Sequence, residues 1–277
     1  MLSVLLGAVL HASWNALVKS SPDKFLDTIL ISMGAALLCL PLLPFLPQPA
    51  TASLPYLFTS SCIHVGYFTL VAAAYKAGDM SLAYPLMRGT APMIVAMASG
   101  PLIGEHLGLA AWTGVCLICF GVIVLASSGW RKGGRPSGRA VLLALLNALV
   151  IATYTFVDGV GARLSGNAFA YTVWLFVVLA IWLVIWAHLL RPAPVVRAHV
   201  LSRWKLGLAG GFCTFGSYVL ALMAMVHAPV ATVSALRETS ILFGVAIAAL
   251  ILKEKVGVQR LGAAVLVVCG AAALKFA

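Results

Sequence analysis

Charged residues are scarce in this sequence. Only 9% of its 277 residues are charged and only 7 are Asp or Glu, whereas 62% are hydrophobic and the mean hydropathy is +1.07. A chain of this length cannot bury so much apolar surface in a water-soluble core. The composition excludes an ordinary soluble domain and predicts a multi-pass membrane protein.

The sequence also lacks the motifs on which common reaction chemistries depend. It contains no nucleophile elbow, phosphate-binding loop, H-E-x-x-H or metal-ligand spacing. All 6 cysteines fall within apolar runs, where a thiol behaves as a small hydrophobe, so neither a disulfide framework nor a metal site is predicted. We therefore expect no enzyme activity, no cofactor and no ATP hydrolysis by this chain.

The formal net charge of +11 lies in short segments between the apolar runs. Lys and Arg in such segments set membrane topology and contact lipid headgroups. No nucleic-acid partner is therefore predicted. The expected partners are the lipid bilayer, a small-molecule substrate and a coupling proton, for a chain that is a monomer or a homodimer.

Ten apolar runs are long enough to cross a bilayer, because about 20 helical residues span its ~30 Å hydrocarbon layer. Tryptophan and tyrosine near the expected ends are predicted to be interfacial anchors; they are Trp112, Trp130, Tyr171, Trp174, Trp186 and Trp204. The helices are expected at 2–19, 27–46, 54–77, 80–100, 109–128, 139–158, 169–190, 204–227, 229–252 and 260–276.

Two stretches of the chain repeat at a fixed spacing. Arg88, Thr90 and Glu105 recur 149 residues later as Arg237, Thr239 and Glu254. The chain therefore divides into a first five-helix repeat at 1–130, a linker at 131–138 and a second repeat at 139–277. Because five is an odd number, the second repeat enters the membrane from the opposite side. The expected fold is an all-α membrane protein of ten transmembrane helices in two inverted repeats.

The basic residues predict an orientation. Outside the helices that hold Arg88 and Arg237, the odd-numbered connections carry every Lys and Arg except Arg163 and Lys275. By the positive-inside rule these connections are cytoplasmic, and both termini face away from the cytoplasm.

Arg88 is expected near the middle of the fourth helix, between Pro85 and Pro92. Each proline removes a backbone donor, so the helix is predicted to kink there. An arginine at a helix centre costs at least ~2.5–3.5 kcal/mol to insert and needs a partner or water. Tyr84 lies one turn earlier on the same face and is a candidate lining residue.

Arg237 and Glu238 are adjacent, so their side chains point about 100° apart on a helix. In the first interpretation Arg88 and Arg237 face a central cavity and Glu238 titrates there. In the second, Glu238 bridges to one of the arginines and the set is structural. The excess positive charge favours an anion or the acidic group of a zwitterion.

Further polar side chains share helix faces at i, i+3 and i+4 spacings. The predicted substrate-binding residues are Arg88, Arg237, Tyr84, Trp14, Asn15, Tyr154 and Tyr218, and the coupling candidates are Glu238, His11, His64 and Asp158. Each of the uncharged residues is equally compatible with a satisfied interhelical hydrogen bond. For Asp158 the structural interpretation is stronger, because Arg163 follows nearby. Gly207 and Gly211 form a G-x-x-x-G that favours close helix packing.

The motifs AYPLMRGTAPM and TVSALRETSIL, each followed by Glu before a final helix with a late glycine, resemble the EamA family of the drug/metabolite transporter superfamily along the whole chain. HASWNALVKSSPDK and YTFVDGVGARLSG also resemble permeases found near phosphonate-utilisation operons. The resemblance implies a ten-helix secondary transporter working by alternating access. The expected location is the bacterial cytoplasmic (inner) membrane.

Three functions remain open at this stage. The first is transport of a small organic anion or zwitterion, such as an amino acid, phosphonate or carboxylate. The second is proton-coupled export of cationic or aromatic drug-like compounds, using Glu238 and Asp158. The third is a membrane-embedded enzyme that acts on lipid headgroups, for which the sequence offers no catalytic constellation.

Overall fold

The computed structural model describes residues 1–19, 23–77, 80–133, 137–250 and 257–276, and within these ranges all regular structure is helical. The all-α prediction is therefore confirmed. The elements are α1 (Leu2–Lys19), α2 (Lys24–Cys39), η1 (Leu40–Phe45), η2 (Thr51–Ser53), α3 (Leu54–Ala77), α4 (Met80–Ile103), α5 (Leu109–Gly133), α6 (Gly138–Leu164), α7 (Ala168–Leu190), α8 (Ala193–His227), α9 (Val230–Arg237), α10 (Ser240–Leu250) and α11 (Val258–Lys275).

Local sequence signals set several helix ends. The Asp23 carboxylate accepts from Leu26 N–H at 3.1 Å and caps α2, and Asn167 caps α7 through Ala170 N–H at 3.0 Å. Gly104 and Gly166 follow α4 and α6 with φ of 69° and 73°, a conformation that glycine adopts without steric cost. Polar caps and glycines therefore separate the apolar runs.

Within the described residues, six segments are long and apolar enough to cross a membrane: Lys24–Phe45, Thr51–Val71, Pro85–Ile103, Gly138–Leu164, Ala168–Leu190 and Ala193–His227. Shorter apolar helices occupy Leu2–Val18, Leu109–Leu125 and Leu261–Lys275. Many large apolar side chains on these helices are exposed at the molecular surface, including Leu109, Leu189 and Leu201. A lipid environment accommodates such a surface.

Helix α8 is longer than predicted, because it starts at Ala193 instead of residue 204. Its 35 residues rise about 52 Å, well beyond the ~30 Å hydrocarbon layer. The added turns carry Arg197 and Arg203, which the apolar-run criterion excludes from a spanning helix. The helix therefore continues through a polar zone.

The expected ninth helix is not continuous. It is divided into α9 and α10 at Glu238 and Thr239, where backbone N–H groups donate to carbonyls three residues earlier at 3.0 and 3.1 Å. The Thr239 hydroxyl also donates to Leu236 O at 2.7 Å and occupies a carbonyl that the helix would use. Helix α4, in contrast, runs as a helix through Pro85 and Pro92. The irregular backbone lies beside Arg237, not beside Arg88.

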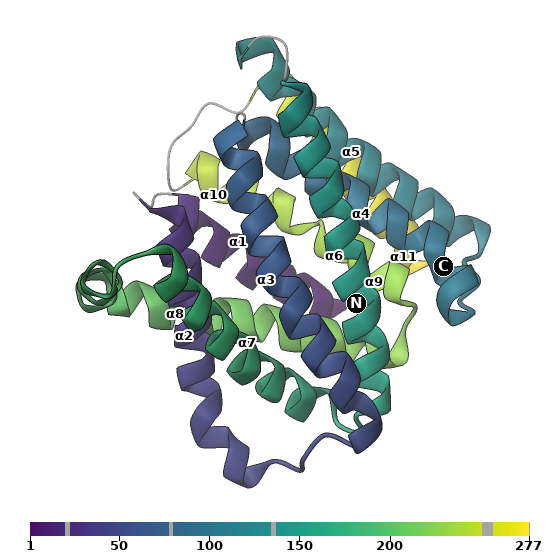
Figure 1. Cartoon of the computed structure of the whole chain (residues 1–277). Coiled ribbons are helices and arrows are strands. Elements are labelled where there is room, and N and C mark those ends of the chain that lie inside the picture. Colours follow the sequence, from purple (N-terminus) through teal and green to yellow (C-terminus); the bar gives the residue numbers. More distant parts are fainter. Residues whose placement is uncertain (20–22, 78–79, 134–136, 251–256, 277) are drawn as a thin grey trace.

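The two halves of the chain are interleaved. Figure 1 shows α4, α5 and α11 packed together on one side, with α2, α7 and α8 gathered on the other. Helix α3 packs on α6, and α1 packs on α8; α4 contacts α6, and α1 contacts α9 and α10. The contact of α3 with α6 therefore corresponds to the contact of α8 with α1. The contact of α4 with α6 corresponds in the same way to the contact of α9 with α1.

Glycine permits the closest helix contact. Gly34 of α2 lies directly on the Gly207 carbonyl of α8, and Gly211 lies on the backbone of Gly34 and Ala35. The close packing predicted from the G-x-x-x-G of α8 is confirmed, and its partner is α2.

Candidate functional site

A cavity of about 70 Å³ lies inside the helix bundle. That volume holds a few water molecules or a small solute, whereas drug-sized ligands occupy roughly 300–1,000 Å³. Eight helices supply its lining: His11, Trp14, Thr28, Ile31, Ser32, His64, Tyr67, Phe68, Arg88, Tyr154, Leu175, Phe176, Leu179, Thr214, Ser217, Tyr218 and Arg237.

Arg88 and Glu238 form a buried ion pair between the two halves of the chain. Arg88 Nε donates to Glu238 Oε2 at 3.0 Å, and Arg88 Nη2 lies 2.7 Å from Glu238 Oε1. The side chains are only 6% and 4% exposed. This two-point arrangement is the strongest geometry of an arginine and a carboxylate. Of the two interpretations of Glu238, the structure therefore shows the bridge to an arginine, and that arginine is Arg88.

Arg237 has a different environment, although the repeat makes it the counterpart of Arg88. Its guanidinium carbon lies 5.1 Å from the centroid of the Tyr218 ring, within reach of a cation–π interaction. Its Nε is buried and has no hydrogen-bond partner among the described residues, and no carboxylate in the same residues forms an ion pair with it. Arg237 is therefore a cation in the cavity wall whose hydrogen-bonding capacity is unfilled.

Asp158 of α6 is fully buried and lies next to the Tyr218 hydroxyl. The Tyr171 hydroxyl donates to its Oδ1 at 3.2 Å, and the Tyr218 hydroxyl donates to Oδ2. The expected partner, Arg163, does not contact it; Arg163 belongs to α6 and pairs with Glu105. Tyr171 was predicted to be an interfacial anchor, and that prediction is wrong, because its ring is completely buried against Asp158.

His11 and Trp14 line the cavity from α1. Trp14 Nε1–H donates to His11 Nδ1 at 3.2 Å, and the two rings meet edge to face at 5.2 Å. Since an indole nitrogen only donates, His11 Nδ1 has no proton, and the neutral ring carries its proton on Nε2. Asn15 is turned to the backbone, where its amide donates to His11 O at 2.7 Å, and it is not one of the lining residues.

An aromatic group from three helices covers another part of the wall. His64 stacks on Tyr154 with ring centroids 4.2 Å apart, and Tyr67 meets Tyr154 edge to face at 5.8 Å. His64 Nδ1 donates to Ser60 O at 2.9 Å, which fixes the ring orientation. The Tyr218 ring of α8 meets His64 edge to face at 6.1 Å, so the predicted site residues His64, Tyr154 and Tyr218 are brought together.

The lining includes residues that the sequence interpretation missed. Thr28 and Ser32 contribute hydroxyls from α2, and Thr214 and Ser217 contribute hydroxyls from α8. Their i, i+4 and i, i+3 spacings place each pair on one helix face, the only sequence signal that identifies them. Of the predicted site residues, Glu238, Asp158 and Asn15 lie outside the lining, and the side chain of Tyr84 lies outside the described residues. Glu254, the predicted counterpart of Glu105 in the sequence repeat, also lies outside the described residues.

A second polar cluster lies between α2 and α8. The completely buried Asp27 accepts from His199 Nε2 at 2.6 Å and from Arg203 Nε and Nη2 at 2.9 and 2.8 Å. The sequence interpretation did not include Asp27, because its partners lie more than 170 residues away. Together with Gly34 against Gly207, this cluster fixes α8 to α2.

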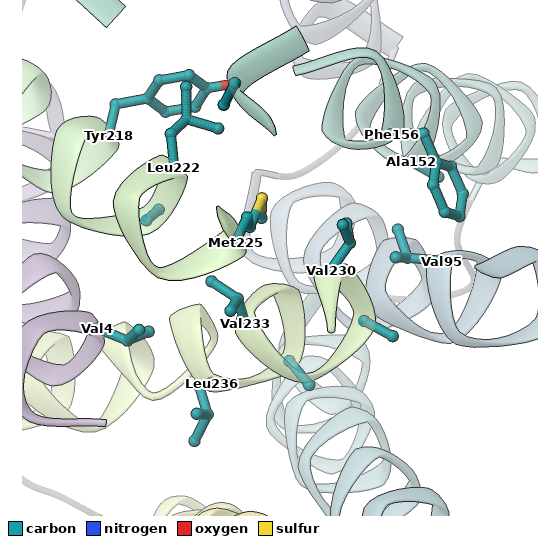
Figure 2. Close-up of a cluster of buried hydrophobic side chains, with 14 of the residues drawn as sticks. Val4, Val95, Ala152, Phe156, Tyr218, Leu222, Met225, Val230, Val233 and Leu236 are labelled. Carbon is teal, nitrogen blue, oxygen red and sulfur yellow. The ribbon is translucent and has the colours of Figure 1, made fainter. Parts of the chain in front are cut away.

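An apolar layer separates the cavity from one end of the bundle. Figure 2 shows Leu222 and Met225 following Tyr218 along α8, with Val230 and Val233 of α9 facing them. At that end Glu105 accepts from Arg163 Nη2 at 2.5 Å and from Val230 N–H at 2.8 Å. We call this end of the helix bundle the Glu105 end.

Arg163 ties the same end of the bundle to α8. Its Nε donates to Met225 O at 2.8 Å, and its Nη2 donates to Ala228 O at 3.0 Å. A cation on the last carbonyls of α8 and an anion on the first N–H of α9 both complement the helix dipoles. Four chain segments are therefore fastened together at the Glu105 end.

Among the described residues, no group of three or more His, Cys, Asp or Glu side chains is placed to hold a metal ion. The cavity lining consists of two arginines, two histidines, a tryptophan, Tyr and Phe rings, hydroxyl groups and three aliphatic side chains.

Comparison with known proteins gives the following matches. A solved structure described only as "Crystal structure of protein" aligns with a TM-score of 0.74 at 20% identity, over 99% of this chain and 98% of that one. This likeness shows the fold alone. A curated relative, "Uncharacterized protein y4nH" of Sinorhizobium fredii (strain NBRC 101917 / NGR234), is 37% identical over 60 residues, which are 22% of this chain. The chain spans about half (51%) of the length of that relative.

The family comparison identifies the class of protein. The model of the "EamA-like transporter family" matches residues 138–275, from the first turn of α6 to the end of α11. The matched part contains Arg237, Tyr154 and Tyr218 of the cavity wall. Together with the apolar helices, the match indicates an integral, multi-pass membrane protein. The chain belongs to the EamA-like transporter family of the drug/metabolite transporter superfamily.

Proposed function

We propose that this protein is a secondary transporter that moves a small organic anion or zwitterion by alternating access. The observation that carries the proposal is the charge of the cavity wall. Its lining includes Arg88 and Arg237 but no Asp or Glu among the described residues, and Arg237 has no carboxylate partner there. An acidic group of a ligand supplies the carboxylate partner that the Arg237 guanidinium lacks among the described residues.

The remainder of the wall suits the neutral or positive part of such a ligand. Thr28 and Ser32 donate their hydroxyl protons to Lys24 O and Thr28 O, at 2.7 and 3.1 Å. Their oxygen lone pairs are thus the groups left to accept from a ligand amine. The aromatic rings of Tyr154 and Phe176 cover an apolar portion. Export of large cationic compounds is less favoured, because the cavity is small and lined by cations.

The interleaved packing supports the ten-helix, inverted-repeat architecture that we propose. Its helix contacts occur in pairs that exchange the first and second halves, as a two-fold relation requires. The interrupted α9 and α10 correspond to the discontinuous helices found at transporter binding sites. We further propose a bacterial cytoplasmic membrane, with the Glu105 end facing away from the cytoplasm.

The proposed function predicts that Arg237→Gln abolishes transport. Loss of the charge-assisted hydrogen bonds, each worth about 1.5–3 kcal/mol, is expected to weaken ligand binding roughly 100-fold. The measurement is uptake of radiolabelled amino acids and carboxylates into proteoliposomes. Arg197→Gln is the matched control, because Arg197 is exposed on α8 and does not line the cavity. Wild-type uptake by the Arg237 variant would contradict the proposal.

Alternating access predicts that the Glu105 end opens during transport. A cysteine in place of the lining residue Thr214, in a background without the native cysteines, is expected to react with a membrane-impermeant thiol reagent only from the opposite end. Glu105→Gln removes the ion pair between Glu105 and Arg163. Labelling from the Glu105 end should then rise about tenfold, since a charged hydrogen bond is worth about 1.5–3 kcal/mol.

A second acid-to-amide substitution controls for the loss of charge. Asp23→Asn breaks an exposed ion pair with Arg191 at 3.7 Å, and asparagine still caps α2. It should leave labelling from the Glu105 end unchanged. Equal labelling from both ends in the parent protein would show that the ion pair between Glu105 and Arg163 does not close this end.

A further inference from the structure

We propose that Glu238 determines the charge class of the substrate: by neutralising Arg88 it leaves Arg237 as the single uncompensated arginine, so the site accepts a ligand with one acidic group and rejects a second. This inference rests on the proposed function and narrows it to monocarboxylates. Glu238 is thereby a specificity-determining residue that need not touch the substrate.

The first step is the charge balance of the ion pair. Both oxygens of Glu238 contact Arg88, through Nε at 3.0 Å and Nη2 at 2.7 Å. The pair is almost completely buried, so solvent does not screen its two charges separately. Its net charge is zero, although the Arg88 side chain lines the cavity.

The second step is that Asp158, another buried carboxylate, forms no ion pair with Arg237 among the described residues. Asp158 has both oxygens occupied by the Tyr171 and Tyr218 hydroxyls and does not line the cavity. The Tyr218 hydroxyl contacts that carboxylate, whereas the face of the Tyr218 ring lies 5.1 Å from the Arg237 guanidinium carbon. Arg237 Nε is buried and has no hydrogen-bond partner among the described residues.

The third step concerns the two histidines of the wall. His11 accepts from Trp14 Nε1–H through Nδ1, which a doubly protonated ring cannot do, so His11 adds no charge. His64 Nδ1 donates to Ser60 O at 2.9 Å, and in this neutral form the ring adds no charge to the wall. The cavity therefore holds one unbalanced positive charge.

A monocarboxylate, whose net charge is −1, brings this balance to zero. A second acidic group on the ligand finds no cation and is desolvated in a buried site, where unpaired charges are strongly unfavourable. A neutral amide of the same shape carries no such penalty. The expected discrimination is thus between ligands that differ in charge but not in size.

The test uses an isosteric pair. Purified protein in detergent, at constant ionic strength and neutral pH, is titrated with succinamate and with succinate while its thermal unfolding is followed. A bound ligand raises the unfolding temperature by mass action, which gives a dissociation constant. We expect succinamate to bind at least tenfold more tightly than succinate.

Two variants separate the charge effect from other causes. Glu238→Gln removes the carboxylate that neutralises the Arg88 guanidinium and should bring succinamate and succinate to equal affinity, or reverse the preference. Because that variant takes the carboxylate partner from a buried arginine, Arg88→Gln/Glu238→Gln provides a second measurement. The double variant restores a single cation, Arg237, and should keep the preference of the wild-type protein.

The outcomes distinguish this inference from the proposed function. Equal affinity of the wild-type protein for succinate and succinamate, or a double variant that loses the preference, would overturn the inference and leave anion transport in place. If neither compound stabilises the wild-type protein, the proposed function falls, and the inference falls with it.

Discussion

Arg88→Leu is expected to lower the free energy of unfolding by about 3–5 kcal/mol, because it leaves the Glu238 carboxylate buried without its cation. Arg237→Leu, at the matching position of the second half, is expected to change it by less than about 1 kcal/mol, since no carboxylate among the described residues pairs with Arg237. Equilibrium unfolding in mixed detergent micelles measures both values.

The matched control removes both members of the pair. Arg88→Leu/Glu238→Leu replaces two buried charges by apolar groups, and such replacements are often neutral or stabilising. The double variant should recover most of the stability lost by Arg88→Leu. An Arg88→Leu variant as stable as the wild-type protein would mean that Arg88 and Glu238 are not paired in the membrane.

Gly34→Ala is expected to destabilise the protein by about 3 kcal/mol or more. The added methyl group would overlap the backbone carbonyl of Gly207 on α8, so the two helices must separate. Overpacking costs typically 1–3 kcal/mol, and the cost is highest where backbone, not a flexible side chain, must move. The crossing lies in the same helix pair that contributes Thr28, Ser32, Thr214 and Ser217 to the cavity, so ligand binding should also weaken.

Gly66→Ala is the matched control for this substitution. Gly66 lies in the middle of α3, and a methyl group there meets nothing within 4 Å. Alanine is a better helix former than glycine by about 1 kcal/mol, so this variant should be as stable as the wild-type protein or more stable. Equal stability of the two variants would contradict the backbone crossing of α2 and α8.

Much of the fold followed from local features of the sequence. The apolar runs predicted the helices, and the structure shows local features at their ends: Asp23 and Asn167 cap helix starts, and Gly104 and Gly166 follow helix ends. The start of α8 was misplaced because a helix does not stop where its residues become polar. The break between α9 and α10 was missed because neither glycine nor proline marks it.

The sequence by itself determined the all-helical membrane class and the 149-residue relation between Arg88 and Arg237, since both depend on residue type and spacing along the chain. Only the tertiary structure decided how the two arginines differ. Glu238 is adjacent to Arg237 in sequence, but the turn between α9 and α10 directs its carboxylate across the bundle to Arg88. The identity of a buried charge's partner depends on which helices lie side by side, and no local pattern carries that information.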